Sequence, residues 1–237
     1  MIIKIPKKGS LSDWNNWHGI TLLSVPSKIF CKVIIQRITQ AVDDILRNEQ
    51  AGFRKGRGCT DQIFTLRNIL EQCTEWNRQL YVNFNDYEGC VMPSVLFNIA
   101  IDWVLRRTVE DQRRGIRWTP FSTLEDLDFA DDLALLSHTW QHIQEKTDWL
   151  SIFSNHVGLT IGLKKTGAMC VKVPSPTEIR VRGQGIQYTD KFTYLGSVLC
   201  RDGGTVVDIR NRLNKARNAF MSLRSVWRSA KKAQRRS

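Results

Sequence analysis

The 237-residue sequence lacks the features of several protein classes. Its six cysteines are scattered, and no CxxC pair or Cys/His cluster has the spacing of zinc ligands. No apolar run approaches the roughly 18–20 residues of a membrane-spanning helix, and residues 1–8 lack the apolar core of a signal peptide. Internal repeats and low-complexity tracts are also absent. We therefore expect a reduced, intracellular protein, nuclear or cytoplasmic, with no membrane partner.

Acidic residues are also in short supply. The chain has 23 Asp and Glu against 35 Lys and Arg, which gives a net charge of +12. Much of the excess lies in residues 201–237, where only Asp202 and Asp208 oppose the basic residues. A basic end can simply be solvated, so it is modest support for a polyanionic partner such as nucleic acid. The hydrophobic content of 42% indicates a folded chain of one large or two small domains.

An adjacent acidic pair, Asp131 and Asp132, lies inside the apolar stretch 124–137. Apolar, strand-prone residues flank the pair on both sides, so the pattern predicts a tight hairpin with both carboxylates at its tip. Adjacent acids at a turn are more often solvated turn residues. Here the flanks predict buried strands, which would hold the carboxylates at the edge of a core. Carboxylates held in this way are suitable ligands for Mg²⁺.

Apolar periodicity predicts the other elements. Helices are expected at 26–45, 60–76, 94–108 and 140–156 and from Val206 onward, and strands at 1–6, 80–84, 159–161, 168–173, 178–182, 186–189 and 192–199. Between residues 80 and 173 the order is β-α-β-β-α-β, an α+β, ferredoxin-like arrangement. Asp86 follows the strand at 80–84 and precedes Asp131 by 45 positions, so only folding can bring the two together. Taken alone, Asp86 would more often be a loop residue or a helix cap.

A glycine-rich basic segment occupies residues 52–58. Glycine allows close backbone approach, and Arg54, Lys55 and Arg57 supply positive charge, so phosphate contact is one interpretation. A flexible surface loop is an equally good interpretation from these residues alone.

Five motifs occur in an order that is typical of one enzyme family. They are NWHGITLL at 16–23, QAGFRKGR at 50–57, FADD at 129–132, GL at 158–159 followed by KKT at 164–166, and FTYLG at 192–196. Over nearly its whole length the chain resembles the reverse transcriptases of non-LTR (LINE-type) retrotransposons. The resemblance implies an RNA-directed DNA polymerase that uses an RNA template, a DNA primer, deoxynucleoside triphosphates and Mg²⁺ or Mn²⁺.

The same resemblance implies a right-hand polymerase-like fold with a ferredoxin-like palm. Its parts would be partial fingers at 1–79, the palm at 80–173, primer-grip-like strands at 174–204, and a basic thumb-like helix and tail at 205–237. The basic helix could equally be a docked helix with a solvated face.

The resemblance also assigns the site residues. Asp86 and Asp131 would hold two metal ions, and Asp132 would assist. Lys165 would neutralise or protonate the leaving pyrophosphate. Nucleotide or nucleic-acid contacts would come from Arg54, Lys55, Arg57, Lys165, Arg210, Lys215 and Arg217.

One part of the family pattern is missing. Glu88 is followed directly by Gly89, which resembles a motif that stands several tens of residues later in the family. We therefore expect an internal deletion between Glu88 and Gly89, with loss of the aromatic residue that screens the nucleotide sugar. Three functions stay open: a polymerase, impaired by the deletion; a catalytically inactive nucleic-acid-binding relic; and a degenerate copy without function.

Overall fold

The computed structural model describes residues 2–6, 12, 17–21, 24–87, 94–110 and 114–224. The chain divides into two compact units, Met1–Ile45 and Leu46–Ser237, and each is described by itself. Several expectations lie outside the described residues. They concern residues 16, 22 and 23 of the motif at 16–23, the junction between Glu88 and Gly89, and the basic tail beyond residue 224.

The first unit contains a two-stranded sheet and one helix. Strand β1 (Ile2–Pro6) pairs antiparallel with β2 (Trp17–Thr21), and helix α1 (Val25–Ile45) follows. The hydroxyl of Ser24 accepts a 3.4 Å hydrogen bond from the N–H of Ser27, as an N-terminal capping residue does. Pro26 lies in the first turn, where its missing N–H costs no helical hydrogen bond. The strand predicted at 1–6 and the helix predicted at 26–45 are confirmed.

The second unit is built on a four-stranded antiparallel sheet. Its strands, in the order β6-β7-β3-β8, are β6 (Asp126–Phe129), β7 (Asp132–Ser137), β3 (Leu80–Asn85) and β8 (Gly167–Val171). Helix α3 (Ser94–Val109) comes between β3 and β6 in the chain, and α4 (Trp140–His156) comes between β7 and β8. The predicted α+β class and the predicted order of these elements are confirmed. A short hairpin of β4 (Ile116–Arg117) and β5 (Thr123–Leu124), which was not predicted, precedes β6.

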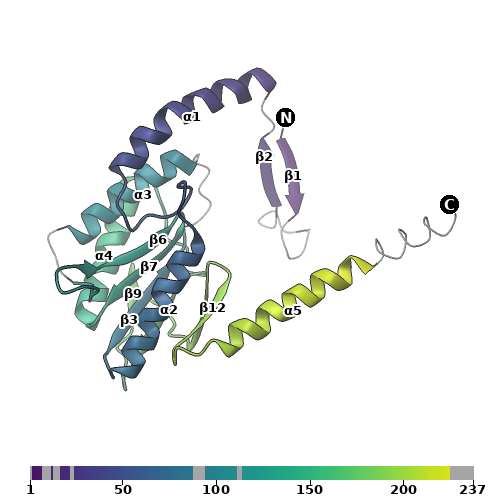
Figure 1. The fold of residues 1–237 in the computed structure, drawn as a ribbon. Helices are drawn as coiled ribbons and strands as arrows, with labels where there is room; N and C mark the ends of the chain where they lie inside the picture. Colours follow the sequence, from purple (N-terminus) through teal and green to yellow (C-terminus); the bar gives the residue numbers. More distant parts are fainter. Residues whose placement is uncertain are drawn as a thin grey trace. The chain divides into compact units, whose positions relative to one another are not determined.

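Each face of this sheet is covered by a different set of elements (Figure 1). Helices α3 and α4 pack on one face, where the side chain of Tyr81 joins their core cluster. On the other face lie helix α2 (Cys59–Glu75) and the hairpin of β11 (Lys191–Tyr194) and β12 (Ser197–Cys200), which pack with Val82 and Phe84. Strand β3 is therefore buried along its whole length on both faces.

Three details differ from the sequence-based expectations. Helix α2 begins at Cys59, one residue before its expected start at 60. Gly58 is its N-cap, and the carboxylate of Asp61 bonds back to the Gly58 N–H. Residues 159–161 form only a single bridge, from Ile161 to Tyr87, instead of a strand.

The third difference concerns the strands expected at 178–182, 186–189 and 192–199, which would form a small meander. The structure instead has two separate hairpins, one of β9 (Arg180–Val181) with β10 (Gln184–Gly185) and the other of β11 with β12. At the centre of each turn both residues have positive φ, first Arg182 and Gly183 and then Leu195 and Gly196. This is the signature of a tight type I′ turn, so each strand folds back on its own partner.

The chain continues into helix α5 (Val206–Ser222), close to its predicted start. Within the described ranges, no helix has both the length and the apolar character needed to cross a membrane. The cysteines that the structure describes are free thiols: Cys31, Cys59, Cys73, Cys170 and Cys200.

Candidate metal and nucleic-acid site

Strands β3 and β7 bring the predicted acidic residues to one end of the sheet. Asp86 directly follows β3, and Asp132 begins β7. The last paired residues of the ladder are Asn85 and Leu133, so the register puts Asp86 across from Asp132. Directly opposed residues of an antiparallel pair project from the same face, with Cβ atoms about 4.5–5.5 Å apart. The structure therefore brings together carboxylates that are far apart in the sequence.

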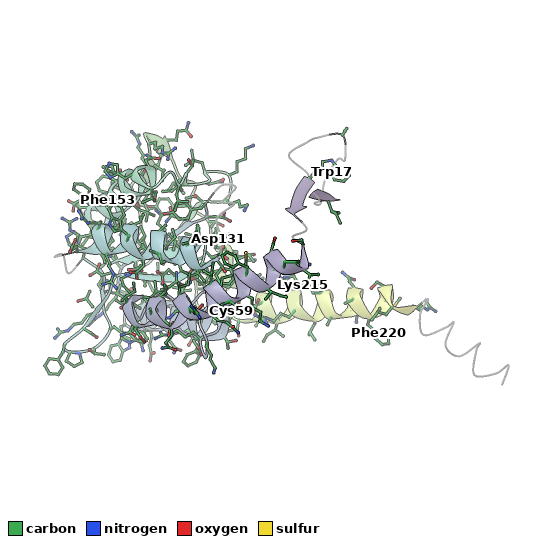
Figure 2. The ribbon with its side chains drawn as sticks, turned by 90° about the horizontal axis from the view of Figure 1, so that it is seen from above. Trp17, Cys59, Asp131, Phe153, Lys215 and Phe220 are labelled. Carbon is green, nitrogen blue, oxygen red and sulfur yellow. The ribbon has the colours of Figure 1, made fainter. Side chains whose placement is uncertain are left out.

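Asp131 occupies the turn between β6 and β7. Phe129 and Asp132 form the closing pair of this hairpin, so its loop consists of Ala130 and Asp131 alone. Ala130 has a φ of 59°, the sign that the two-residue turns of hairpins require at this position. Asp131, labelled in Figure 2, is exposed at the tip, whereas Asp132 is half-buried. The predicted hairpin with its acidic tip is confirmed.

The backbone of the segment at 50–57 supports this turn. The N–H of Ala51 donates a 3.0 Å hydrogen bond to the carbonyl of Asp128, and Asn98 donates one of 2.8 Å to the carbonyl of Gly52. A Cβ atom on Gly52 would lie 2.3 Å from the backbone nitrogen of Ala130. Only glycine lets the two chains approach this closely. Part of this motif therefore positions the acidic turn.

Lys165 is a cation next to the acidic end. Its ammonium group donates a 2.9 Å hydrogen bond to the carboxylate of Asp86, and the lysine side chain is otherwise exposed. This bond and the nearby charges of Asp86, Asp131 and Asp132 raise the pKa of Lys165. Partial burial raises the pKa of Asp132 to about 6, and the negative charges of Asp131 and Asp86 add to the effect. The three carboxylates thus repel one another at neutral pH, and a bound cation would relieve the repulsion.

A cavity of about 310 Å³ opens beside these groups. Its lining includes Asp86, Asp132 and Lys165 together with Phe192, Thr193 and Tyr194 from β11. The ring of Phe192 stacks on Phe84 at a centroid distance of 4.0 Å, which fixes β11 against the end of β3. The motif predicted at 192–196 therefore forms one wall of the space next to the carboxylates.

The carboxylates fit a divalent metal only as a partial ligand set. Among the described residues, no group of three or more His, Cys, Asp or Glu side chains is arranged to hold a metal ion by itself. Mg²⁺ commonly binds one or two protein carboxylates and completes its octahedron with water and substrate phosphate. Asp86 and Asp132, with Asp131 beside them, are compatible with a site of that kind.

The three basic residues of the segment at 50–57 have different environments. Arg54 donates hydrogen bonds to the carbonyls of Arg47 and Gln50, and Arg57 donates to the carbonyl and the side chain of Asn48. Both guanidinium groups stabilise the loop. Lys55 is exposed. The predicted contact of these residues with phosphate stays a prediction.

Helix α5 is attached to the second unit by its first turn. The buried carboxylate of Asp208 accepts 2.8 Å hydrogen bonds from Arg67 and Arg212 and a 2.7 Å bond from the N–H of Val198. Burial alone would raise the pKa of Asp208, but the hydrogen bonds from Val198 and Arg212 lower it. Beyond this turn the residues of α5 are exposed or half-buried.

The three basic residues predicted on α5 lie on two faces of the helix. Arg210 and Arg217 line the same shallow surface as the exposed apolar residues Leu213 and Phe220. Lys215 is five positions before Phe220, which corresponds to about 140° around the helix; Figure 2 labels both residues. Arg210 and Arg217 can therefore contact one strand of a ligand together, whereas Lys215 cannot join them.

A buried ion cluster beneath the acidic hairpin was not predicted from the sequence. Arg47 donates to both carboxylate oxygens of Asp126, at 3.0 and 2.8 Å, and to Asp128 at 2.9 Å. The backbone N–H of Arg47 also bonds to Asp102. Asp126 and Asp128 are fully buried. Burial would lower the pKa of Arg47, but the two carboxylates raise it; burial raises the pKa of Asp128 to about 8.

The local sequence gives no signal for this cluster. Asp126 and Asp128 alternate with the apolar Leu127 and Phe129 in a strand, which is the pattern of a solvated face. Their burial depends on Arg47, 79 positions before Asp126, and such a distant partner has no local signature.

Comparison with known proteins gives a partial match. No family model matches the chain. Over 66 residues, or 28% of its length, the chain is 33% identical to the "Transposon TX1 uncharacterized 149 kDa protein" of Xenopus laevis. The match covers only 5% of that protein. Part of the chain is thus similar to a transposon protein many times its length.

Proposed function

We propose that this chain is the reverse transcriptase region of a non-LTR retrotransposon, with extension activity impaired by an internal deletion between Glu88 and Gly89. The observation that carries the proposal is the convergence of Asp86, Asp131 and Asp132 at one end of β3 and β7, beside Lys165 and a cavity. The partial similarity to a transposon protein supports the proposed origin. The substrates would be an RNA template, a DNA primer and deoxynucleoside triphosphates.

In this proposal the sheet β6-β7-β3-β8 with α3 and α4 is a ferredoxin-like polymerase palm, occupying residues 80–173. Its strand order and β-α-β-β-α-β connectivity are compatible with that assignment. Residues 1–79 would be partial fingers, 174–204 the primer-grip-like strands, and 205–237 a thumb-like helix and tail.

Asp86 and Asp131 would hold the metal ions, Mg²⁺ or Mn²⁺, with Asp132 completing the carboxylate set. A bound divalent ion supplies Lewis acidity to the primer hydroxyl and to the phosphates. The protein residues orient the reactants around it. Lys165 would leave Asp86 and place its charge on the leaving pyrophosphate, because its exposed side chain is free to move. Residues of β11 would hold the primer end beside the cavity that they line.

Primer extension on an RNA template tests this proposal. We expect slow, Mg²⁺-dependent extension by the full chain and its loss in Asp131→Asn or Asp132→Asn. Asp148→Asn is a suitable control, because Asp148 is an exposed carboxylate on α4. Extension that survives both changes at the acidic hairpin would show that these carboxylates are not the catalytic set.

A binding-only relic is the second candidate, and one observation favours it. Asp86 is already paired with Lys165, and the described residues contain no complete ligand group for a metal. Such a protein would retain nucleic acid in a salt-sensitive way, and Asp131→Ala would leave this retention unchanged. Detectable extension by the unchanged chain would exclude the relic.

The junction itself can be tested on the gene. Sequencing genomic DNA and cDNA across the codons for Glu88 and Gly89 shows whether coding sequence separates them. Contiguous codons in both would support the deletion and an impaired enzyme. Intervening in-frame codons that are kept in the transcript would instead indicate a complete polymerase.

A further inference from the structure

A second pocket, of about 270 Å³, lies at the opposite end of the sheet from the acidic residues. It is lined by Trp76 and Arg78 near the end of α2, by Ile116, Arg117 and Trp118 of the β4–β5 hairpin, and by His138 after β7. Strands β3 and β7 each span six residues between the two ends. At about 3.3 Å per residue, roughly 20 Å separate this pocket from the carboxylates. Its chemistry is therefore independent of the acidic site.

Two exposed indole rings flank this pocket. Trp76 is 70% exposed and Trp118 is 44% exposed. Large aromatic side chains usually bury their rings in a core, so two indoles at the mouth of one pocket need an explanation. Phe121, in the turn of the same hairpin, is 95% exposed. The buried side chains of Ile69 and Ile116 contribute apolar surface to the pocket lining.

The polar groups around the pocket are cationic or neutral. None of its described lining residues is Asp or Glu, whereas Arg78 and Arg117 are both among them. One Arg117 nitrogen donates a 3.2 Å hydrogen bond to the Pro120 carbonyl, which orients its guanidinium group. The Arg78 side chain makes no hydrogen bond or ion pair with the part of the chain that is described. Charge complementarity therefore favours an anion.

His138 adds a further hydrogen-bonding group. Its Nδ1 lies 2.7 Å from the carbonyl oxygen of Gln79. Because a carbonyl only accepts, Nδ1 must carry the hydrogen, and Nε2 is left as the acceptor in the neutral ring. The pocket thus combines flat aromatic faces, two guanidinium groups and one acceptor nitrogen.

We propose that the pocket between Trp76 and Trp118 binds an unpaired base of single-stranded nucleic acid, with Arg78 and Arg117 on the adjoining phosphates. Bases stack on aromatic side chains whatever their identity, and cationic residues follow the backbone. The volume is near the lower end of the roughly 300–1,000 Å³ of ligand pockets, so it suits one ring system and not a duplex. This site would hold the strand away from the acidic end.

Photocrosslinking of the unchanged chain locates the bound base directly. A short single-stranded oligonucleotide with 5-iodouracil is bound and irradiated, and the linked peptides are identified by mass spectrometry. We expect links to Trp76 or Trp118. Links only to other aromatic residues, or none at all while the oligonucleotide is bound, overturn the proposal. This readout needs neither metal nor polymerase activity, so it stands or falls separately from the proposed function.

Affinity measurements test the stacking. With a fluorescent 12-mer at low salt, Trp118→Leu should weaken binding roughly 5- to 150-fold, the range expected for one lost base–aromatic stack. Trp118→Phe, which keeps a flat ring, should restore most of it. Trp149→Ala is the matched control, because Trp149 is 43% exposed on α4.

A strand without bases separates base recognition from charge. An abasic oligonucleotide of the same length should bind more weakly, and its affinity should not depend on Trp118. If the abasic strand binds as tightly as the normal one, or if Trp118→Leu and Trp118→Phe have the same affinity, the pocket contacts only phosphate. Either result would show that the proposal is wrong.

Discussion

Asp128 should make the stability of the protein fall as the pH rises. The side chain is fully buried in β6, beside Asp126 and within 2.9 Å of Arg47. Arg47 is bonded to both oxygens of Asp126, so its charge is shared between two carboxylates. Burial raises the pKa of Asp128 from 3.8 to about 8. At neutral pH the folded protein therefore keeps a proton on this group, and the unfolded chain does not.

The size of the effect follows from proton linkage. The contribution of Asp128 is fully present below its unfolded pKa near 4 and is lost as the pH rises toward about 8. Between about pH 4 and pH 7 the folded state holds one more proton. At about 1.4 kcal/mol per pH unit, the free energy of unfolding should fall by about 4 kcal/mol from this group.

Asp128→Asn removes the titration and keeps the shape of the side chain. Urea unfolding of both proteins at pH 4, 5, 6 and 7 isolates the effect, because groups that do not interact with Asp128 titrate alike in the two. We expect the free energy of unfolding of the variant, relative to that of the unchanged protein, to rise by about 4 kcal/mol from pH 4 to pH 7. Asp126→Asn is the contrast: it loses the paired bonds to Arg47 and should destabilise the fold at pH 7. A constant difference between Asp128→Asn and the unchanged protein would refute the reasoning.

Three further substitutions test how the site is supported. Arg47→Met leaves the buried carboxylate of Asp126 uncompensated and should lower the free energy of unfolding by about 3–5 kcal/mol, as measured by urea titration. Asp208→Ala removes the acceptor that holds the first turn of α5 and should cost about 1–3 kcal/mol; hydrogen exchange should speed up in α5 and β12. Gly52→Ala puts a Cβ atom 2.3 Å from the Ala130 nitrogen and should cost about 1–3 kcal/mol in thermal unfolding. Gly58→Ala, with an open Cβ position, should cost less, because it only weakens the N-cap of α2.

The local pattern was sufficient to predict most elements of the second unit. Helix α4 has its predicted bounds, because its apolar spacing and the cap at Thr139 agree. The acidic hairpin was predictable because two apolar runs leave room for only a short turn. The sequence-based predictions fail where tertiary contacts or turn geometry determine the structure. Two pairs of positive-φ residues split the expected meander into hairpins, and the first of these pairs includes Arg182, which carries no turn signal of its own.

The candidate site was also predicted from the sequence only in part. Sequence motifs identified Asp86, Asp131, Asp132 and Lys165, and the structure brings these residues together. The register adds what spacing could not: Asp132 is the residue across from Asp86, and Asp131 lies in the turn. A one-residue difference in register would exchange the faces of the two acids.

The two ends of strands β3 and β7 have opposite chemistry. At one end, the repulsion among three carboxylates favours binding of a cation. At the other end, two arginines favour binding of an anion. Both strands are buried between these two ends, so neither end can move relative to the other without disrupting the core. A strand of nucleic acid held at the aromatic pocket would therefore lie at a fixed distance from the carboxylates. Because α2 and the β4–β5 hairpin form the pocket without any residue of the acidic site, this spacing would persist in a chain that had lost catalysis.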